Sequence, residues 1–158
     1  MSLIQDVLGI ISGTLFLIEA YQPTVNLWIG GVASSYFILD MIYFVKEPDL
    51  YLHHACALWF AFNVVYDPYP PEVLRTIANV EWSTLVLTLH NYLTGTWLLC
   101  SQVLFVVLFI KTRLIALFPL LFSRLTFLQW FPLVPFYGLN VYWFFTICKR
   151  IKTFSKSE

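Results

Sequence analysis

The sequence predicts an all-α fold, a multispanning transmembrane helical bundle of about six spans. Of its 158 residues 59% are hydrophobic and only 11% are charged, and nine acidic with nine basic side chains cannot coat a soluble domain of this length. The second observation is a set of long runs without Asp, Glu, Lys or Arg, since crossing a bilayer takes about 20 mostly apolar residues. The charge-free runs are residues 7–18, 20–39, 50–66, 82–110 and 125–148.

Turn-forming residues separate the runs and set the helix boundaries. Proline and charged residues gather at Lys46 to Asp49 and at Asp67 to Pro71, and Pro23 follows the first run. The run 82–110 is long enough to contain a turn, for which Gly95 is the natural site. We therefore expect helices near residues 3–20, 25–45, 50–66, 72–93, 97–118 and 125–148. Loops this short make neighbouring helices antiparallel, with backbone groups bonded inside each helix.

The ends of the chain indicate its orientation in the membrane. No Lys or Arg precedes the first apolar run, so we interpret residues 3–20 as a retained helix rather than a signal peptide. The last ten residues hold four basic groups, which favours a cytosolic end close to anionic headgroups and predicts no nucleic-acid partner. Residues 1–150 then form one transmembrane domain and residues 151–158 a basic cytosolic tail. With six spans, the N-terminus and Lys46 are cytosolic too.

Two cations disagree with this pattern. Lys111 and Arg113 fall toward the outer end of the fifth expected span, where positive charge is disfavoured. Such side chains must either reach back to the membrane surface or line the interior of the bundle.

Five ionisable residues lie within the expected spans, and each is a candidate for function because an ionisable group is costly in hydrocarbon. Structural pairing is the competing interpretation. Four of the five share one depth near the cytosolic side, whereas Glu81 lies near mid-membrane. This distribution predicts a polar chamber that opens toward the cytosol. The five residues are Asp40, His53, His54, Glu81 and His90.

Angular positions on the fourth expected helix separate two of these residues. Glu81 and His90 are nine residues apart, which places them on opposite faces at about 100° per residue. Thr84 and Thr88 lie on the Glu81 side, so we expect this polar stripe to face the interior and to contact substrate. We expect His90 at a helix contact or near the cytosolic interface.

The adjacent histidines are the most informative feature. His53 and His54 diverge by about 100° on a helix, so they are poorly arranged to chelate one metal ion, and we expect no metal. One imidazole can act while the other orients it or pairs with Asp40. Cys56 lies one turn from His53, which permits a Cys–His nucleophile pair, although a small buried thiol more often packs between helices.

Four short motifs, taken in order, resemble the TLC-domain family. They are residues 36–40 from Tyr36 to Asp40, Leu52-His53-His54, Glu81-Trp82-Ser83-Thr84, and Asn140-Val141-Tyr142-Trp143 ahead of the basic tail. The resemblance covers about residues 30 to 150. Members of this family are multispanning proteins of the endoplasmic reticulum and Golgi, among them ceramide synthases, translocon-associated proteins and lipid-regulatory or cargo-receptor branches.

The resemblance also implies chemistry. In ceramide synthases the histidines corresponding to His53 and His54 are required for acyl transfer from acyl-CoA to a sphingoid amine. At the next motif this chain has Glu81 in the acidic position, Val80 in place of a histidine and Thr84 in place of a later aspartate. It is therefore closer to the TLC-domain proteins outside the synthase branch. The implied location is the endoplasmic reticulum or Golgi, or a host membrane if a virus encodes the chain.

Together these observations predict a multi-pass membrane protein of lipid metabolism or lipid homeostasis. The enzymatic hypothesis is acyl transfer to a lipid amine or hydroxyl, with membrane lipids as partners, acyl-CoA as co-substrate and no cofactor. Its predicted catalytic residues are His53, His54, Asp40 and Glu81, and its predicted substrate-binding residues are Thr84, Thr88, Tyr36 and Lys46, the last as a cation near the CoA phosphates. The alternative is a non-enzymatic lipid-sensing, lipid-transport or cargo-receptor protein in which the same residues bind a headgroup or each other. An ion channel is the least supported hypothesis.

Overall fold

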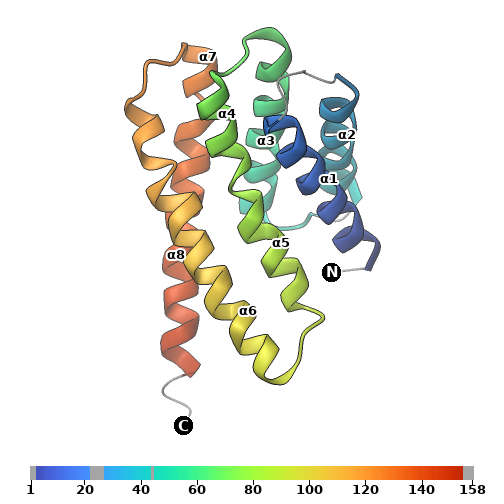
Figure 1. Ribbon diagram of the computed structural model, residues 1–158, viewed down its shortest axis with the longest axis vertical. Helices are drawn as coiled ribbons and strands as arrows, with labels where there is room; N and C mark the ends of the chain where they lie inside the picture. The colour runs from blue at the N-terminus through green and yellow to red at the C-terminus, as the bar shows by residue number, and fades with distance from the viewer. Residues whose placement is uncertain (1–2, 22–26, 44, 155–158) are drawn as a thin grey trace.

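The computed structural model describes residues 3–21, 27–43 and 45–154, and the regular elements in these ranges are all helical (Figure 1). They form six successive helical segments. The first three are continuous helices: α1 (Leu3–Tyr21), α2 (Leu27–Tyr43) and α3 (Pro48–Tyr66). The other three are interrupted: α4 (Pro71–Ala78) with α5 (Glu81–His90); α6 (Gly95–Leu108) with the π-helix η1 (Phe109–Ile115) and the 3₁₀-helix η2 (Phe118–Phe122); and α7 (Phe127–Trp130) with α8 (Leu133–Phe154).

The all-α prediction and the number of helical segments are confirmed, and the interruptions are the difference. The single helix expected over residues 72–93 is wrong, because a turn at Asn79 and Val80, with backbone hydrogen bonds to the third preceding residue, separates α4 from α5. The helix expected over 97–118 contains a π-helical turn. Pro132 separates α7 from α8, as a residue without a backbone N–H does. Helix α8 continues to Phe154, so it runs four residues into the predicted tail; residues 155–158 lie outside the described part of the chain.

Two helical segments are long and apolar enough to cross a membrane. They are Gly95–Phe122 and Phe127–Lys149, and Asp6–Ile18 forms a shorter apolar helix. In Figure 1, α6 and the C-terminal part of α8 extend beyond α1, α2 and α3.

The six segments are arranged as a closed ring. Helix α1 contacts α2, α2 contacts α3, and α3 contacts α8. On the other side α8 contacts η1, η1 continues from α6, α6 contacts α5, and α5 returns to α1. A ring of this kind has an interior to which every segment can direct side chains.

An apolar core fills the ring at the α4 end. It is built by buried residues of α3, α4, α8 and the connections next to α4 and between η1 and η2, among which Phe60 packs edge-on against Phe136 and Tyr69. The buried members are Cys56, Phe60, Tyr69, Val73, Ile77, Val80, Leu117, Leu133 and Phe136. Cys56 therefore packs as a small apolar residue.

At this end, hydrogen bonds connect the linker between α3 and α4 with α3 and with α7. The hydroxyl of Tyr69 accepts from Asn63 Nδ2 at 3.0 Å and donates to the carbonyl of Gln129 at 2.9 Å. Gln129 Nε2 in turn donates to the carbonyls of Asp67 and Pro68. Burial raises the pKa of Tyr69 to about 12, so its hydroxyl remains a donor at neutral pH.

Side-chain hydrogen bonds also join the elements at the opposite end. Tyr92, just after α5, donates to Asp6 on α1 at 2.7 Å, and this hydrogen bond raises the pKa of Tyr92. Trp143 on α8 donates to Asp49 at the start of α3 at 2.6 Å. The turn between α5 and α6 ends at Gly95, whose φ of 58° lies in the left-handed region that favours glycine. The predicted site of this turn is confirmed.

Candidate functional site

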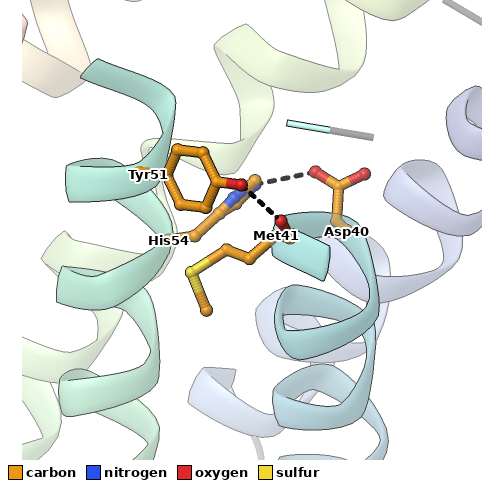
Figure 2. A network of polar contacts seen from close by, with 4 residues as sticks. All are labelled: Asp40, Met41, Tyr51 and His54. Atoms are coloured by element: carbon orange, nitrogen blue, oxygen red, sulfur yellow. Dashed lines mark hydrogen bonds and ion pairs between the residues drawn. The ribbon is translucent and has the colours of Figure 1, made fainter. Parts of the chain in front are cut away.

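Asp40 and His54 meet across the α2–α3 interface, and both are buried. His54 Nε2 lies 3.0 Å from Asp40 Oδ2, as Figure 2 shows. The pair forms because α2 and α3 are antiparallel neighbours joined by a short linker, which brings the end of α2 beside the first turns of α3. Beside it, the hydroxyl of Tyr51 donates to the carbonyl of Met41 at 2.8 Å and ties the same two helices together (Figure 2).

His53 points to a different part of the interior from its neighbour. Its ring stacks on Phe136 and lies 5.4 Å from the ring of Trp143, both on α8, while the two imidazole centroids are 5.5 Å apart. The Nδ1 atoms of His53 and His54 are both buried without a hydrogen-bond partner. A buried polar atom is normally paired, so these two nitrogens are available for a bound polar group.

Tyr36 completes the surroundings of the histidine pair. Its ring centroid is 6.4 Å from that of His54, and Phe37 lies closer, at 5.3 Å. The Tyr36 hydroxyl is next to Gly9 of α1, where an added Cβ would lie 3.1 Å from it. The absence of a side chain at Gly9 therefore lets the phenol enter between α1 and α2.

Arg113 is the main feature of the site whose position the sequence left open, between the membrane surface and the interior of the bundle. It is only 4% exposed and lies inside the ring, on the π-helical turn η1. Its guanidinium donates to Ser83, Thr84 and the carbonyl of Val80, and also to Asn140 on α8. Ring faces of Phe109 and Trp143 lie 5.5 and 6.0 Å from its Cζ. Of the two alternatives for this cation, lining the interior is the one the structure adopts.

Glu81 lies at the first position of α5, between α1 and the arginine. Its carboxylate lies within electrostatic range of Arg113. On the other side an added Cβ at Gly13 would be 3.3 Å from Glu81 Oε2. The missing side chain at Gly13 thus makes room for the carboxylate.

A pair of glycines tests this close approach. Replacing Gly13 with valine is expected to lower the free energy of unfolding by about 1 to 3 kcal/mol, because the new side chain meets Glu81. At Gly138 in α8 no atom lies within 4 Å of an added Cβ, so Gly138→Ala is expected to raise stability by about 0.5 to 1 kcal/mol. Unfolding by dodecyl sulfate in mixed micelles measures both. Equal effects at the two positions would contradict the packing of Glu81 against α1.

The remaining predicted residues lie outside this cluster or bond within their own helix. Thr88 is buried and donates to the carbonyl of Thr84 at 3.1 Å. Lys46 is exposed on the linker before α3. His90 lies at the contact between α5 and α6, with its Nδ1 3.0 Å from Ser101 Oγ, so the expectation of a helix contact is confirmed.

Ser83 and Asn140 were not among the predicted site residues, although both are 0% exposed and bond Arg113. Their only signal in the sequence is that each belongs to a motif of the TLC resemblance. Within the described residues no group of three or more His, Cys, Asp or Glu side chains is suited to hold a metal ion.

The site is therefore a connected set of polar groups inside the ring. It runs from the Asp40–His54 pair through His53 and Trp143 to Arg113. The imidazoles at one end are groups that can accept or deliver a proton, and the hydrogen-bonded guanidinium of Arg113 stands at the other. No family model, no curated protein and no solved structure matches this chain.

Proposed function

We propose that this chain is a multi-pass membrane protein of lipid metabolism or homeostasis that transfers an acyl group to a lipid amine or hydroxyl. The proposal places all six helical segments across the membrane, in the endoplasmic reticulum or Golgi. The observation that carries it is the histidine pair, in which both Nδ1 atoms are buried without a partner and Asp40 lies 3.0 Å from the buried His54. An imidazole held in this way inside an apolar ring is suited to general base or nucleophilic catalysis.

In the base-catalysed form, one imidazole takes the proton from the lipid amine or hydroxyl as that group attacks the thioester carbonyl of acyl-CoA. A C–N or C–O bond forms, the C–S bond breaks, and the departing thiolate receives the proton from the imidazolium. In the nucleophilic form an imidazole nitrogen attacks the thioester carbonyl, so a C–N bond forms while the C–S bond breaks and the CoA thiolate leaves with the imidazole proton. The lipid amine or hydroxyl then attacks the acyl-imidazole, the C–N bond to the imidazole breaks, and the departing imidazole takes the proton of the lipid group. In both forms the ring interior excludes competing water.

The other residues have supporting roles in this proposal. Asp40 faces Nε2 of His54 and orients the imidazole. Tyr36 borders the His54 ring, and Glu81 and Thr84 on α5 are the other proposed residues of the site. Lys46, exposed near the predicted cytosolic mouth, is the proposed contact for the CoA phosphates.

Purified protein supplied with long-chain acyl-CoA, sphingoid bases and lysolipids tests this function. Mass spectrometry should detect an acylated lipid, and the His53→Ala, His54→Ala double variant should lose at least about 100-fold in rate. His90→Ala is the matched control, because His90 contacts Ser101 away from the pair and should leave turnover unchanged. Turnover no higher than that of the double variant would reject the transferase.

A second candidate function follows from the pairing of the buried polar groups. Asp40 faces His54, and Arg113 bonds Ser83 and Asn140, as expected of a non-enzymatic network that holds a lipid headgroup or the helices themselves. A specific lipid that copurifies with wild-type protein and with the double histidine variant, without turnover in either, would favour this lipid-sensing, transport or receptor role.

A further inference from the structure

One face of α8 forms a slot for the imidazole of His53. Phe136, Asn140 and Trp143 are spaced by four and three residues, so they lie on the same side of the helix. The ring of His53 stacks on Phe136 at a centroid distance of 5.4 Å and lies 5.4 Å from the ring of Trp143. Two helical turns separate these aromatic residues by about 10 Å along the axis, so the imidazole stands between them.

The two aromatic walls of the slot are held by different means. Phe136 belongs to the apolar core, where it is 2% exposed and packs edge-on against Phe60. Trp143 is only half-buried and lies outside that core. Its indole Nε1 instead donates to Asp49 Oδ2 at 2.6 Å. Packing therefore fixes the first wall, whereas a hydrogen bond to Asp49 fixes the second.

Asp49 and His53 approach the same indole from α3. They are four residues apart, one turn of the helix, and so lie on the side that contacts α8. Asp49 accepts from the N–H of Trp143, and His53 lies against its ring. Arg113 also stands over this indole, with its Cζ 6.0 Å from the ring centroid. A change in the orientation of Trp143 would thus alter the surroundings of His53 and Arg113 together.

An acidic residue in the first turn of a helix also has a general role, because its charge interacts favourably with the helix dipole. That role depends on the charge of Asp49 and requires no contact with Trp143. The two roles can be separated by Asp49→Asn, which removes the charge but retains an acceptor oxygen.

We propose that Asp49 is a positioning residue which, through Trp143, holds the imidazole of His53 in one orientation inside the ring. Its importance for turnover rests on the proposed function, in which His53 acts as a base or nucleophile. The position of the indole does not, because it follows from the contacts among Asp49, Trp143 and His53.

Nuclear magnetic resonance of the purified protein in micelles tests this without any substrate. The isotope-labelled indole N–H groups give one signal for each tryptophan, and Trp143→Phe identifies the signal of Trp143. In Asp49→Ala this N–H should exchange with deuterated solvent at least about tenfold faster, because it loses its acceptor. The imidazole signals of His53 should shift at the same time, as the neighbouring indole moves. Asp49→Asn should restore both properties.

Glu47→Ala is the matched control, because Glu47 is an exposed acid beside the start of α3 whose side chain makes no capping hydrogen bond. The signal of Trp59, whose indole donates to the carbonyl of Leu128 at 3.0 Å, should stay unchanged in every variant. An unchanged Trp143 signal in Asp49→Ala, or equal changes in Asp49→Ala and Asp49→Asn, would overturn the proposal.

Two further measurements keep the test decisive. In wild-type protein alone, the Trp143 N–H should exchange more slowly than that of Trp97, which is 72% exposed, and equal rates would overturn the proposal even if Asp49→Ala does not fold. In the acyl-transfer assay, Asp49→Ala should lower kcat about 10- to 100-fold and Asp49→Asn should restore it. Wild-type protein that shows the expected resonance changes but no turnover would reject the transferase and support the role of Asp49.

Discussion

Replacing Arg113 with methionine is expected to lower the free energy of unfolding by about 3 to 5 kcal/mol, because several buried acceptors lose their hydrogen-bond donor. The substitution removes four hydrogen bonds at once. Ser83 and Asn140, both 0% exposed, then keep polar atoms that no water reaches. Titration with dodecyl sulfate in mixed micelles, followed by circular dichroism, measures the change.

Two further variants show whether the effect depends on the charge of Arg113 and on its interaction with Glu81. Lys111→Met removes a cation from the exposed side of the same turn and should change the unfolding free energy by less than about 0.5 kcal/mol. Adding Glu81→Gln to Arg113→Met removes the unpaired carboxylate, so the double variant should be more stable than Arg113→Met. A double variant that loses the sum of the two single effects would show that Glu81 and Arg113 do not interact.

Replacing Phe60 with alanine should also be strongly destabilising, by about 3 to 5 kcal/mol. Phe60 is 2% exposed and its ring lies edge-on to Phe136 at a centroid distance of 5.2 Å, at an interplanar angle of 89°. Truncation leaves a cavity between α3 and α8 whose lining loses its packing partners. The same micelle titration measures this loss.

Phe62→Ala is the matched control on the same helix. Phe62 is 49% exposed, stacks on its neighbour Tyr66 and has a longer contact with the ring of Trp59 on the same helix, so its loss should cost less than about 1 kcal/mol. Equal losses at the two positions would contradict the orientation of α3 in the ring.

The positions of the helices were largely predictable from the sequence. An α-helix bonds its backbone within itself, so apolar runs and turn residues locate it without knowledge of its neighbours. Thus α3 begins at Pro48 and ends at Tyr66, and the turn before α6 uses Gly95.

The interruptions were not predictable, because their causes are tertiary. The helix is interrupted at Asn79 and Val80, although neither residue is a glycine or a proline. The carbonyl of Val80 accepts hydrogen bonds from the side chains of Arg113 and Ser83. The π-helical turn likewise has no local signal. Its result is that Arg113 is buried while Lys111 is exposed.

Some contacts of the candidate site were likewise predictable from the sequence, and others were not. Asp40 and His54 could be expected to meet, because a short linker joins two antiparallel helices, and they lie 3.0 Å apart. The opposite faces of Glu81 and His90 also followed from helix geometry, and His90 does lie against Ser101 on α6.

The sequence by itself determined an apolar, all-α chain of six helical segments and the residues that would be costly to bury in it. Only the tertiary structure decided which of those residues meet. Arg113 collects its partners from α5 and α8, elements about 30 positions away along the chain in either direction. Which groups face each other depends on the rotation of each helix about its own axis, and that rotation is set by packing against the rest of the ring.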